Sequence, residues 1–437
     1  MLTKTDFKNF LECPAYLWLK EFRPDLLPKE TLDEIQRGKM GEEVDNLARR
    51  LFPEGVEVKG FFEDGFAAAK ALMARGKKVL FQPTAISPRG LLARADIVTW
   101  NEKLGAWDIR EVKMGTSVDE KEHFHLSDVA FQKICFEEAG IKIGRIYIIH
   151  VNNEYVKHGE IEPEKFFITV DATDEVEEKI EDVKFGIEAA LNAITSEAAP
   201  DLGMLLACED VKGCKFIRAY CGAYPEAVKL AGRLPAKQLA EFLKYEIFNP
   251  KDVAKDVLES IGYKEGKSFT IIDKPILRQE LLKLKYPLYF LDYETLGLNE
   301  AIPLFDGYKP YQKVPFQYSL HIRESEGGKT RQNEFLARER VDPMPALLEQ
   351  LKRDIGPDGS VIVWNKGFEM TVNKEMAVMH PAYGKFLRSV NDRVFDLMEI
   401  FRFSRKVFIK SEFKQSHSIK KVLPVLCPEL AYSSLEI

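Results

Sequence analysis

Acidic side chains interrupt apolar, strand-like runs at two distant places in this chain of 437 residues. The first place is GLLARADIVTW followed by AWDIREVKM, and the second is YPLYFLDYET. A carboxylate is costly in an apolar strand unless a counter-charge or a bound cation stabilises it. Each run therefore predicts a sheet strand whose acids lie where they can bind something.

Strand-like runs alternate with helical runs in both halves of the chain, which indicates an α/β fold class. We expect helices over 3–20, 30–51, 62–75, 118–139 and 174–196, and strands over 78–83, 90–100, 106–114 and 145–151. A second group of strands and helices begins at Tyr286. We expect one unit over 1–232, a helical connector over 233–285 and a second unit over 286–437.

Composition and charge exclude some classes of protein and some kinds of partner. No apolar run approaches the roughly 18 residues of a membrane span. The N-terminus, MLTKTDFKNFLECP, has charged residues where a signal peptide needs an apolar core. We therefore expect a cytoplasmic protein without a membrane partner. The net charge of −6 argues against coating of nucleic acid by bulk electrostatics, whereas 63 Lys and Arg leave room for a local basic groove.

The first acidic run places an acid and a base on one face of a strand. In IREVK, Glu111 and Lys113 project from the same side, because strand side chains alternate between faces. A hairpin with the preceding strand brings Asp96 beside Glu111. Mg²⁺ or Mn²⁺ prefers such oxygen ligands, and Lys113 would orient or help activate the bound water and stabilise developing negative charge. The pattern predicts a phosphodiester hydrolysis site, although it also fits a surface charge ladder on an edge hairpin.

The surrounding elements resemble the RecB-like branch of the PD-(D/E)XK nucleases. That branch has an acid or a histidine on its first helix, D…(D/E)-x-K on the sheet and a glutamine-aromatic motif on the next helix. Asp96, Glu111 and Lys113 fit the sheet motif, and Gln132 fits the helix motif, with Phe136 in place of the usual tyrosine. The resemblance implies a restriction-endonuclease-like fold and catalytic roles for Asp96, Glu111, Lys113 and Gln132.

The same resemblance implies a metal ligand on the first helix. The usual histidine is replaced by Glu42 or Glu43, and the sequence leaves the choice between them open. We take Glu43 as the expected ligand, together with Asp96 and Glu111.

Four cysteines bracket the first group of strands. Cys13 precedes it, and Cys208, Cys214 and Cys221 follow it, whereas Cys135 and Cys427 have apolar surroundings typical of a core. Four thiolates can complete a Zn²⁺ site or ligate an iron-sulphur cluster, and buried thiols are the other interpretation. Iron-sulphur RecB-like nucleases, including the CRISPR-adaptation type, hold a 4Fe-4S cluster with one cysteine before the nuclease core and three after it. The resemblance implies that cluster, with Zn²⁺ as the alternative because the last three cysteines are more widely spaced than in the family.

The second acidic run places Asp292 and Glu294 on one face of a strand, which suggests a metal. Its D-x-E-T pattern resembles the first motif of DnaQ-like, DEDD-type exonucleases, whose ribonuclease H-like fold uses four acids in two-metal catalysis. VIVWNKGFE resembles the second motif, which implies a ligand role for Glu369. Asp396 in VFDLMEIF is a further ligand candidate, or an acid that interacts with a helix dipole. The last motif of the family would fall beyond Ile437, so we expect Asp396 to complete the site or this half to be impaired or incomplete.

Signatures at both ends make the whole chain resemble a bacterial family that fuses an iron-sulphur RecB-like nuclease half to a DnaQ-like half. The resemblance implies a restriction-endonuclease-like unit followed by a ribonuclease H-like unit. We expect a metal-dependent nuclease that uses Mg²⁺ or Mn²⁺ and acts on DNA rather than RNA, at single strands or ends. The competing hypothesis is a non-catalytic nucleic-acid-binding or assembly protein that retains both folds.

Overall fold

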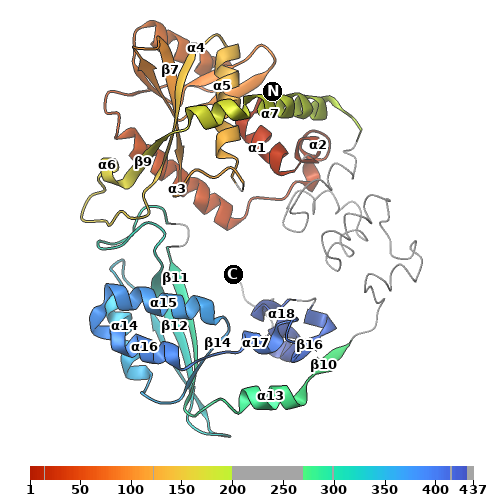
Figure 1. Ribbon diagram of the computed structural model, residues 1–437, viewed down its shortest axis with the longest axis vertical. Helices are drawn as coiled ribbons and strands as arrows, with labels where there is room; N and C mark the ends of the chain where they lie inside the picture. The colour runs from red at the N-terminus through yellow and green to blue at the C-terminus, as the bar shows by residue number, and fades with distance from the viewer. Residues whose placement is uncertain (14, 122, 199–268, 298–299, 414–415, 431–437) are drawn as a thin grey trace. The chain divides into compact units, whose positions relative to one another are not determined.

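The computed structural model describes residues 1–430 except 14, 122, 199–268, 298–299 and 414–415. It has a mixed α/β fold that divides into two compact units (Figure 1). The first unit comprises Met1–Tyr263 and Ala301–Pro310, and the second comprises Lys264–Glu300 and Tyr311–Ile437. The described part of the expected connector, 269–285, therefore belongs to the second unit.

A six-stranded mixed sheet forms the centre of the first unit, in the order β2-β3-β6-β7-β8-β9. Its strands are β2 (Val56–Glu57), β3 (Val79–Phe81), β6 (Ile97–Asn101), β7 (Ala106–Lys113), β8 (Ile143–Val151) and β9 (Phe167–Asp171). β6 and β7 form the expected antiparallel hairpin, and β8 lies parallel to β7. A separate three-stranded sheet has the order β1-β5-β4, with β1 (Leu2–Thr3), β4 (Thr84–Ile86) and β5 (Leu91–Arg94).

The helices of the first unit contribute much of its main apolar core. They are α1 (Lys4–Glu12), α2 (Ala15–Phe22), α3 (Leu32–Arg49), α4 (Phe62–Ala74), α5 (His125–Glu138), α6 (Pro163–Phe166) and α7 (Thr173–Thr195), with a short 3₁₀ turn at Pro24–Leu26. Buried residues of α1, α5 and α7 join those of β7 and β8 in one apolar cluster. Val112, between Glu111 and Lys113, packs instead with Val79, Phe81 and Ile97 in a second cluster, as strand alternation predicts.

Three elements of this unit differ from the sequence expectation. The helix expected over 3–20 is two helices, because Cys13 is extended before Pro14, as residues that precede proline usually are. The strand expected over 90–100 is interrupted before Ile97, so that Asp96 lies just ahead of β6 rather than within a strand. Helix α5 begins at His125, because the Glu120 carboxylate accepts hydrogen bonds from the first free amides, at distances of 2.7 and 3.2 Å.

The second unit contains a five-stranded sheet in the order β13-β12-β11-β14-β15. Its strands are β11 (Leu288–Leu296), β12 (Val314–Arg323), β13 (Thr330–Leu336), β14 (Ser360–Val363) and β15 (Val394–Asp396). The pairs β11·β12 and β12·β13 are antiparallel, whereas β11·β14 and β14·β15 are parallel. A two-stranded sheet pairs β10 (Thr270–Ile272) with β16 (Phe408–Lys410).

Helices of the second unit lie before, between and after its strands, and α15 and α17 directly follow the parallel strands β14 and β15. They are α13 (Lys274–Leu281), α14 (Met344–Asp354), α15 (Lys366–Met379), α16 (Gly384–Asp392), α17 (Met398–Phe401) and α18 (Ile419–Leu426), with 3₁₀ turns at Pro381–Tyr383, Ser411–Phe413 and Pro428–Leu430. In neither unit do the described residues include a helix that is long and apolar enough to span a bilayer.

Helix α1 should be anchored mainly by one aromatic side chain, Phe7. Phe7 has no exposed surface, and its ring stacks on Phe131 of α5 with centroids 5.0 Å apart. Phe7→Ala should lower the free energy of unfolding by about 3–5 kcal/mol, because it removes buried area and leaves a cavity. Phe185→Ala is the control, since Phe185 on α7 is 78% exposed and its loss should cost less than about 0.5 kcal/mol. Equal effects of the two variants in urea denaturation would contradict this account of the core.

Candidate functional site

The β6–β7 hairpin brings Asp96 beside the Glu111–Lys113 pair. The backbone N–H of Val112 donates to Asp96 Oδ2 over 2.8 Å. On the opposite face from Val112, Lys113 Nζ donates to Glu111 Oε1 over 2.9 Å, so the two side chains point the same way. Glu111 is 2% exposed. The three residues therefore meet, and the buried position of Glu111 excludes the alternative of a solvated charge ladder.

Helix α5 adds two polar side chains to this group. Asp128 and Gln132 are four residues apart and thus share one helix face. Gln132 Nε2 donates to Glu111 Oε2 over 2.9 Å and to Asp128 Oδ1 over 3.1 Å, and Lys113 Nζ donates to Asp128 Oδ2 over 2.5 Å. Gln132 thus joins the strand residues as expected. Asp128 was not predicted, although its position one turn before Gln132 was a usable signal.

Lys4 is a second residue that the sequence did not point to. Its Nζ donates to Glu111 Oε1 over 2.8 Å, so that Glu111 lies between two lysines. Lys4 is the first residue of α1 and lies 107 positions from Glu111 in the chain. No spacing rule connects residues so far apart, and the contact depends on how β1 pairs with β5.

Helix α3 contributes Asp45 rather than the glutamates expected from the sequence. Glu42 and Glu43 are exposed, and Glu43 lines a separate hollow with Lys157 and Ile302. Asp45 instead shares a partner with Asp96, because Gln82 Nε2 lies 3.2 Å from Asp45 Oδ2 and 3.3 Å from Asp96 Oδ1. The α3 acid that faces the hairpin is therefore Asp45, two positions after Glu43 and three after Glu42. We call Lys4, Asp45, Asp96, Glu111, Lys113, Asp128 and Gln132 the acid–lysine cluster.

Burial and charge shift the pKa values of the cluster in opposite directions. Burial raises the pKa of Asp96 to about 7, and the nearby Glu111 charge adds to the shift. Burial also acts to raise the pKa of Glu111, but Lys113 and Lys4 outweigh it and hold that pKa below its usual value. The same two lysines hold the pKa of Asp128 far below its usual value against the effect of burial. Both lysine pKa values are raised, because their acidic partners overcome desolvation.

Two oxygens of the cluster are buried and lack a hydrogen-bond partner, Asp45 Oδ1 and Gln132 Oε1. Such oxygens are costly unless a bound cation, a water or a substrate group completes them. Carboxylates of Asp45, Asp96 and Glu111 are the donor type that Mg²⁺ and Mn²⁺ prefer, so the residues fit a hard divalent cation. Among the residues that the structure describes, no three His, Cys, Asp or Glu side chains already converge tightly enough to hold a metal ion.

Three of the four expected acids of the second unit, Asp292, Glu294 and Asp396, lie toward the carboxyl ends of its parallel strands. The parallel pairing of β11 ends at Phe290, just before Asp292, and that of β14 with β15 ends at Asp396. Asp292 and Glu294 alternate with buried Tyr293 and so share one exposed face, as predicted. Carboxyl ends of parallel strands are where open α/β sheets bind ligands.

Glu369 on α15 is 3% exposed, and its Oε2 has no hydrogen-bond partner. Burial raises the pKa of Glu369 to about 7, and the charges of Asp292 and Asp396 add to the shift. The pKa of Asp292 is also raised, by desolvation and then by Glu294, although the side chain is exposed. We call Asp292, Glu294, Glu369 and Asp396 the second acidic cluster.

Asp396 also has a local structural role, because its Oδ1 accepts the Met398 amide over 3.1 Å at the start of α17. Desolvation raises its pKa, while hydrogen bonds from backbone amides, including that of Met398, oppose the shift. The sequence left open whether Asp396 is a ligand or a helix-terminal acid, and both descriptions fit its surroundings.

Only one of the four expected cluster cysteines can be located. Cys13 is fully buried at the end of α1, whereas Cys208, Cys214 and Cys221 lie outside the described residues. The expectation that Cys135 is core is confirmed. Its thiol donates to backbone carbonyls of Ala85 and Leu91, and burial raises its pKa to about 12. Cys427 is only half-buried.

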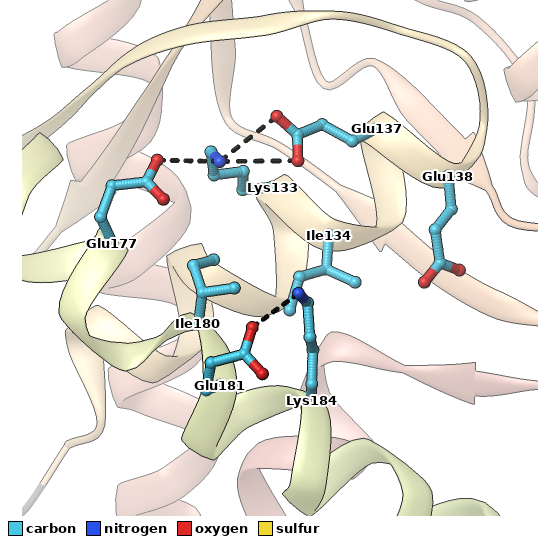
Figure 2. Close-up of a pocket in the computed structure, with 8 residues that line it drawn as sticks. All are labelled: Lys133, Ile134, Glu137, Glu138, Glu177, Ile180, Glu181 and Lys184. Carbon is cyan, nitrogen blue, oxygen red and sulfur yellow. Dashed lines mark hydrogen bonds and ion pairs between the residues drawn. The ribbon is translucent and has the colours of Figure 1, made fainter.

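A hollow of about 410 Å³ between α5 and α7 is distinct from both clusters (Figure 2). Lys133 lies between Glu137 and Glu177 at 3.3 and 2.8 Å, and Lys184 pairs with Glu181 at 2.8 Å. The cations of this hollow are thus already neutralised by neighbouring acids. Since it contains none of the expected site residues, the buried acid–lysine cluster is the stronger candidate for chemistry.

One family model and several curated relatives match parts of the chain. A family model described as a domain of unknown function, DUF2779, matches residues 289–418, which include the whole second acidic cluster. Curated relatives include uncharacterized protein MG366 of Mycoplasma genitalium, 27% identical over 176 residues, and uncharacterized protein UU173 of Ureaplasma parvum, 30% identical over 153 residues. These matches cover 38% and 33% of this chain but 25% and 22% of the relatives, so the chain matches about a quarter of their length. No solved structure matches the chain.

The raised pKa of Glu369 should make the stability of the second unit depend on pH. With a pKa of about 7 in the folded state against an ordinary value of 4.5, the folded protein binds more protons than the unfolded chain between these values. Stability from this group is therefore complete below about pH 4.5 and is lost as the pH rises through 7. Relative to Glu369→Gln, the wild-type free energy of unfolding should fall by up to about 3 kcal/mol over this range, in EDTA-containing buffer.

Urea denaturation at a series of pH values measures this difference. Glu349→Gln, which removes an exposed acid of α14, controls for the loss of one carboxylate. A wild-type minus Glu369→Gln difference that stays constant with pH would show that Glu369 is not protonated at neutral pH.

Proposed function

We propose that this chain is a metal-dependent nuclease that hydrolyses phosphodiester bonds of DNA, at single strands or ends. The observation that carries the proposal is the convergence of Asp96, Glu111, Lys113 and Gln132, from the β6–β7 hairpin and helix α5, around one buried carboxylate. The D…E-x-K hairpin beside a glutamine-bearing helix supports a restriction-endonuclease-like first unit. In the second unit, a mixed sheet with the acid-bearing β11 at its centre supports a ribonuclease H-like assignment.

The first centre would hold Mg²⁺ or Mn²⁺ through Asp96 and Glu111, with Asp45 as the acid from α3. A bound divalent cation supplies Lewis acidity, lowering the pKa of a bound water and neutralising phosphodiester charge. Lys113 would orient the attacking water and stabilise the negative charge that develops on the phosphate. Gln132 holds Glu111 Oε2 and so fixes the orientation of that carboxylate.

The second acidic cluster is proposed as a separate exonuclease-type centre with Asp292, Glu294 and Glu369 as ligands and Asp396 as the fourth acid. The buried, unpartnered Glu369 Oε2 supports this role, because a carboxylate oxygen without a hydrogen-bond donor is suited to a cation. Because the two clusters share no residue, a single substitution in either one tests the role of that cluster alone.

Loss of either centre should reduce cleavage of labelled DNA in Mn²⁺ or Mg²⁺. We expect Glu111→Gln to lower the rate by about 100-fold or more, because it removes a charge that the hydrolytic chemistry requires. Asp292→Asn should abolish a second, separable activity, visible as a changed product pattern on single-stranded or end-labelled substrate. The measurement is a time course on single-stranded DNA, double-stranded DNA and RNA.

Glu137→Gln is the matched control, because Glu137 lies on the same helix as Gln132 but lines the separate hollow. It should leave cleavage unchanged. If neither Glu111→Gln nor Asp292→Asn alters cleavage, or if the wild type cleaves no substrate with either cation, the chain is better described as a binding or assembly protein.

We also propose that Cys13, Cys208, Cys214 and Cys221 ligate a 4Fe-4S cluster that ties the start of the first unit to its end. Protein purified without oxygen should then be coloured and contain iron and sulphide. Cys13→Ser should lose most of the iron, whereas Cys135→Ser, at a buried thiol outside the set, should keep it. Zinc without iron in the wild type would instead identify a Zn²⁺ site.

A further inference from the structure

Lys4 occupies a position in the acid–lysine cluster that the proposed hydrolysis gives no role. Its ammonium contacts Glu111 Oε1, the same oxygen that Lys113 contacts. Gln132 takes the other oxygen, Glu111 Oε2. Both oxygens of Glu111 are therefore engaged by donors from the protein itself.

Two contacts of the residues just before Lys4 fix the backbone at this position. Before it, Leu2 is fully buried and pairs in parallel with Leu91, with its amide donating to the Gly90 carbonyl over 2.9 Å. Immediately before Lys4, Thr3 caps α1 by accepting the Asp6 amide over 3.0 Å. Ordered strand and helix structure thus fixes the position of Lys4, and its ammonium lies against the Glu111 carboxylate.

Asp6 reinforces this arrangement from the other side of α1. It is 4% exposed, and Lys20 Nζ contacts both of its oxygens at 2.7 Å, while Tyr16 donates to Oδ1 over 3.0 Å. This network joins α1 to α2. Lys20 and Tyr16 therefore fix the helix that presents Lys4.

A divalent cation and the Lys4 ammonium cannot both take Glu111 Oε1 at bonding distance. Like charges that close together in a buried site repel by several kcal/mol, and a cation needs a carboxylate lone pair that Lys4 now occupies. Lys113 also contacts Asp128, so it retains an acidic partner when Glu111 turns to a metal. Within the part of the chain that the structure describes, Glu111 is the one residue with which Lys4 forms an ion pair.

We propose that Lys4 is a built-in counter-ion that neutralises Glu111 in the cation-free protein and that leaves Glu111 when a divalent cation binds. This inference rests on the proposed metal centre and adds a regulatory element to it. Lys4 lowers the apparent affinity for the metal and keeps the buried carboxylate stable without it.

The test is Mn²⁺ binding to the full-length protein by isothermal titration calorimetry, without any nucleic acid. Lys4→Met removes the charge and keeps the chain length, and should tighten Mn²⁺ binding by about tenfold or more. Lys4→Arg keeps the charge and should bind Mn²⁺ no more tightly than wild type. Lys8→Met is the matched control, because Lys8 lies one helical turn along α1 and, in the part of the chain that the structure describes, forms no ion pair with Glu111, so its removal should change affinity less than about threefold.

Thermal unfolding provides a second readout that does not depend on activity. Without metal, Lys4→Met should melt below wild type, because Glu111 loses one counter-charge. Excess Mn²⁺ should raise its melting temperature by more than it raises that of wild type. Equal Mn²⁺ affinity of Lys4→Met and wild type, or weaker binding by Lys4→Met, would overturn the counter-ion role and leave the nuclease proposal standing. Absence of Mn²⁺ binding to every variant would overturn the metal centre and this inference together.

Discussion

Burial of the Glu111 carboxylate is the constraint on which the first unit depends. An isolated charge at that depth would destabilise the fold, so the chain must bring compensating groups to it. It does so from three elements, with Lys113 on the same strand, Gln132 on α5 and Lys4 at the start of α1. The packing of α1 against α5 and the pairing of β1 with β5 are therefore coupled to the electrostatics of the site.

Sequence reasoning succeeds here where the chemistry is local. The alternation in IREVK fixes which face Glu111 and Lys113 share, and the hairpin to the preceding strand predicts the approach of Asp96. It fails where a contact depends on tertiary packing. Lys4 meets Glu111 because a two-residue strand docks on β5, and neither periodicity nor a motif marks so short a strand.

The choice among the acids of α3 shows the same limit at finer scale. Glu42 and Glu43 are equally suited by residue type, and the rotation of α3 relative to the sheet decides which carboxylate faces Asp96. Val44, Leu47 and Ala48 are buried, and this stripe leaves Asp45 at its border, facing Gln82. On a helical wheel, Glu43 and Asp45 flank this stripe at similar angles on opposite sides, so periodicity does not choose between them and tertiary packing does.

The two acidic clusters neutralise buried charge by different means, which has consequences for how each would accept a cation. In the first, lysines hold Glu111 and Asp128 ionised, so a cation must displace an ammonium. In the second, the described residues supply no lysine counter-charge to Glu369, and burial with neighbouring acids favours its protonated form near neutral pH. A cation there must displace a proton instead. Metal binding at the second cluster should therefore strengthen as the pH rises, whereas at the first, where the raised pKa of Asp96 gives the same proton dependence, the cation must also compete with Lys4 for Glu111.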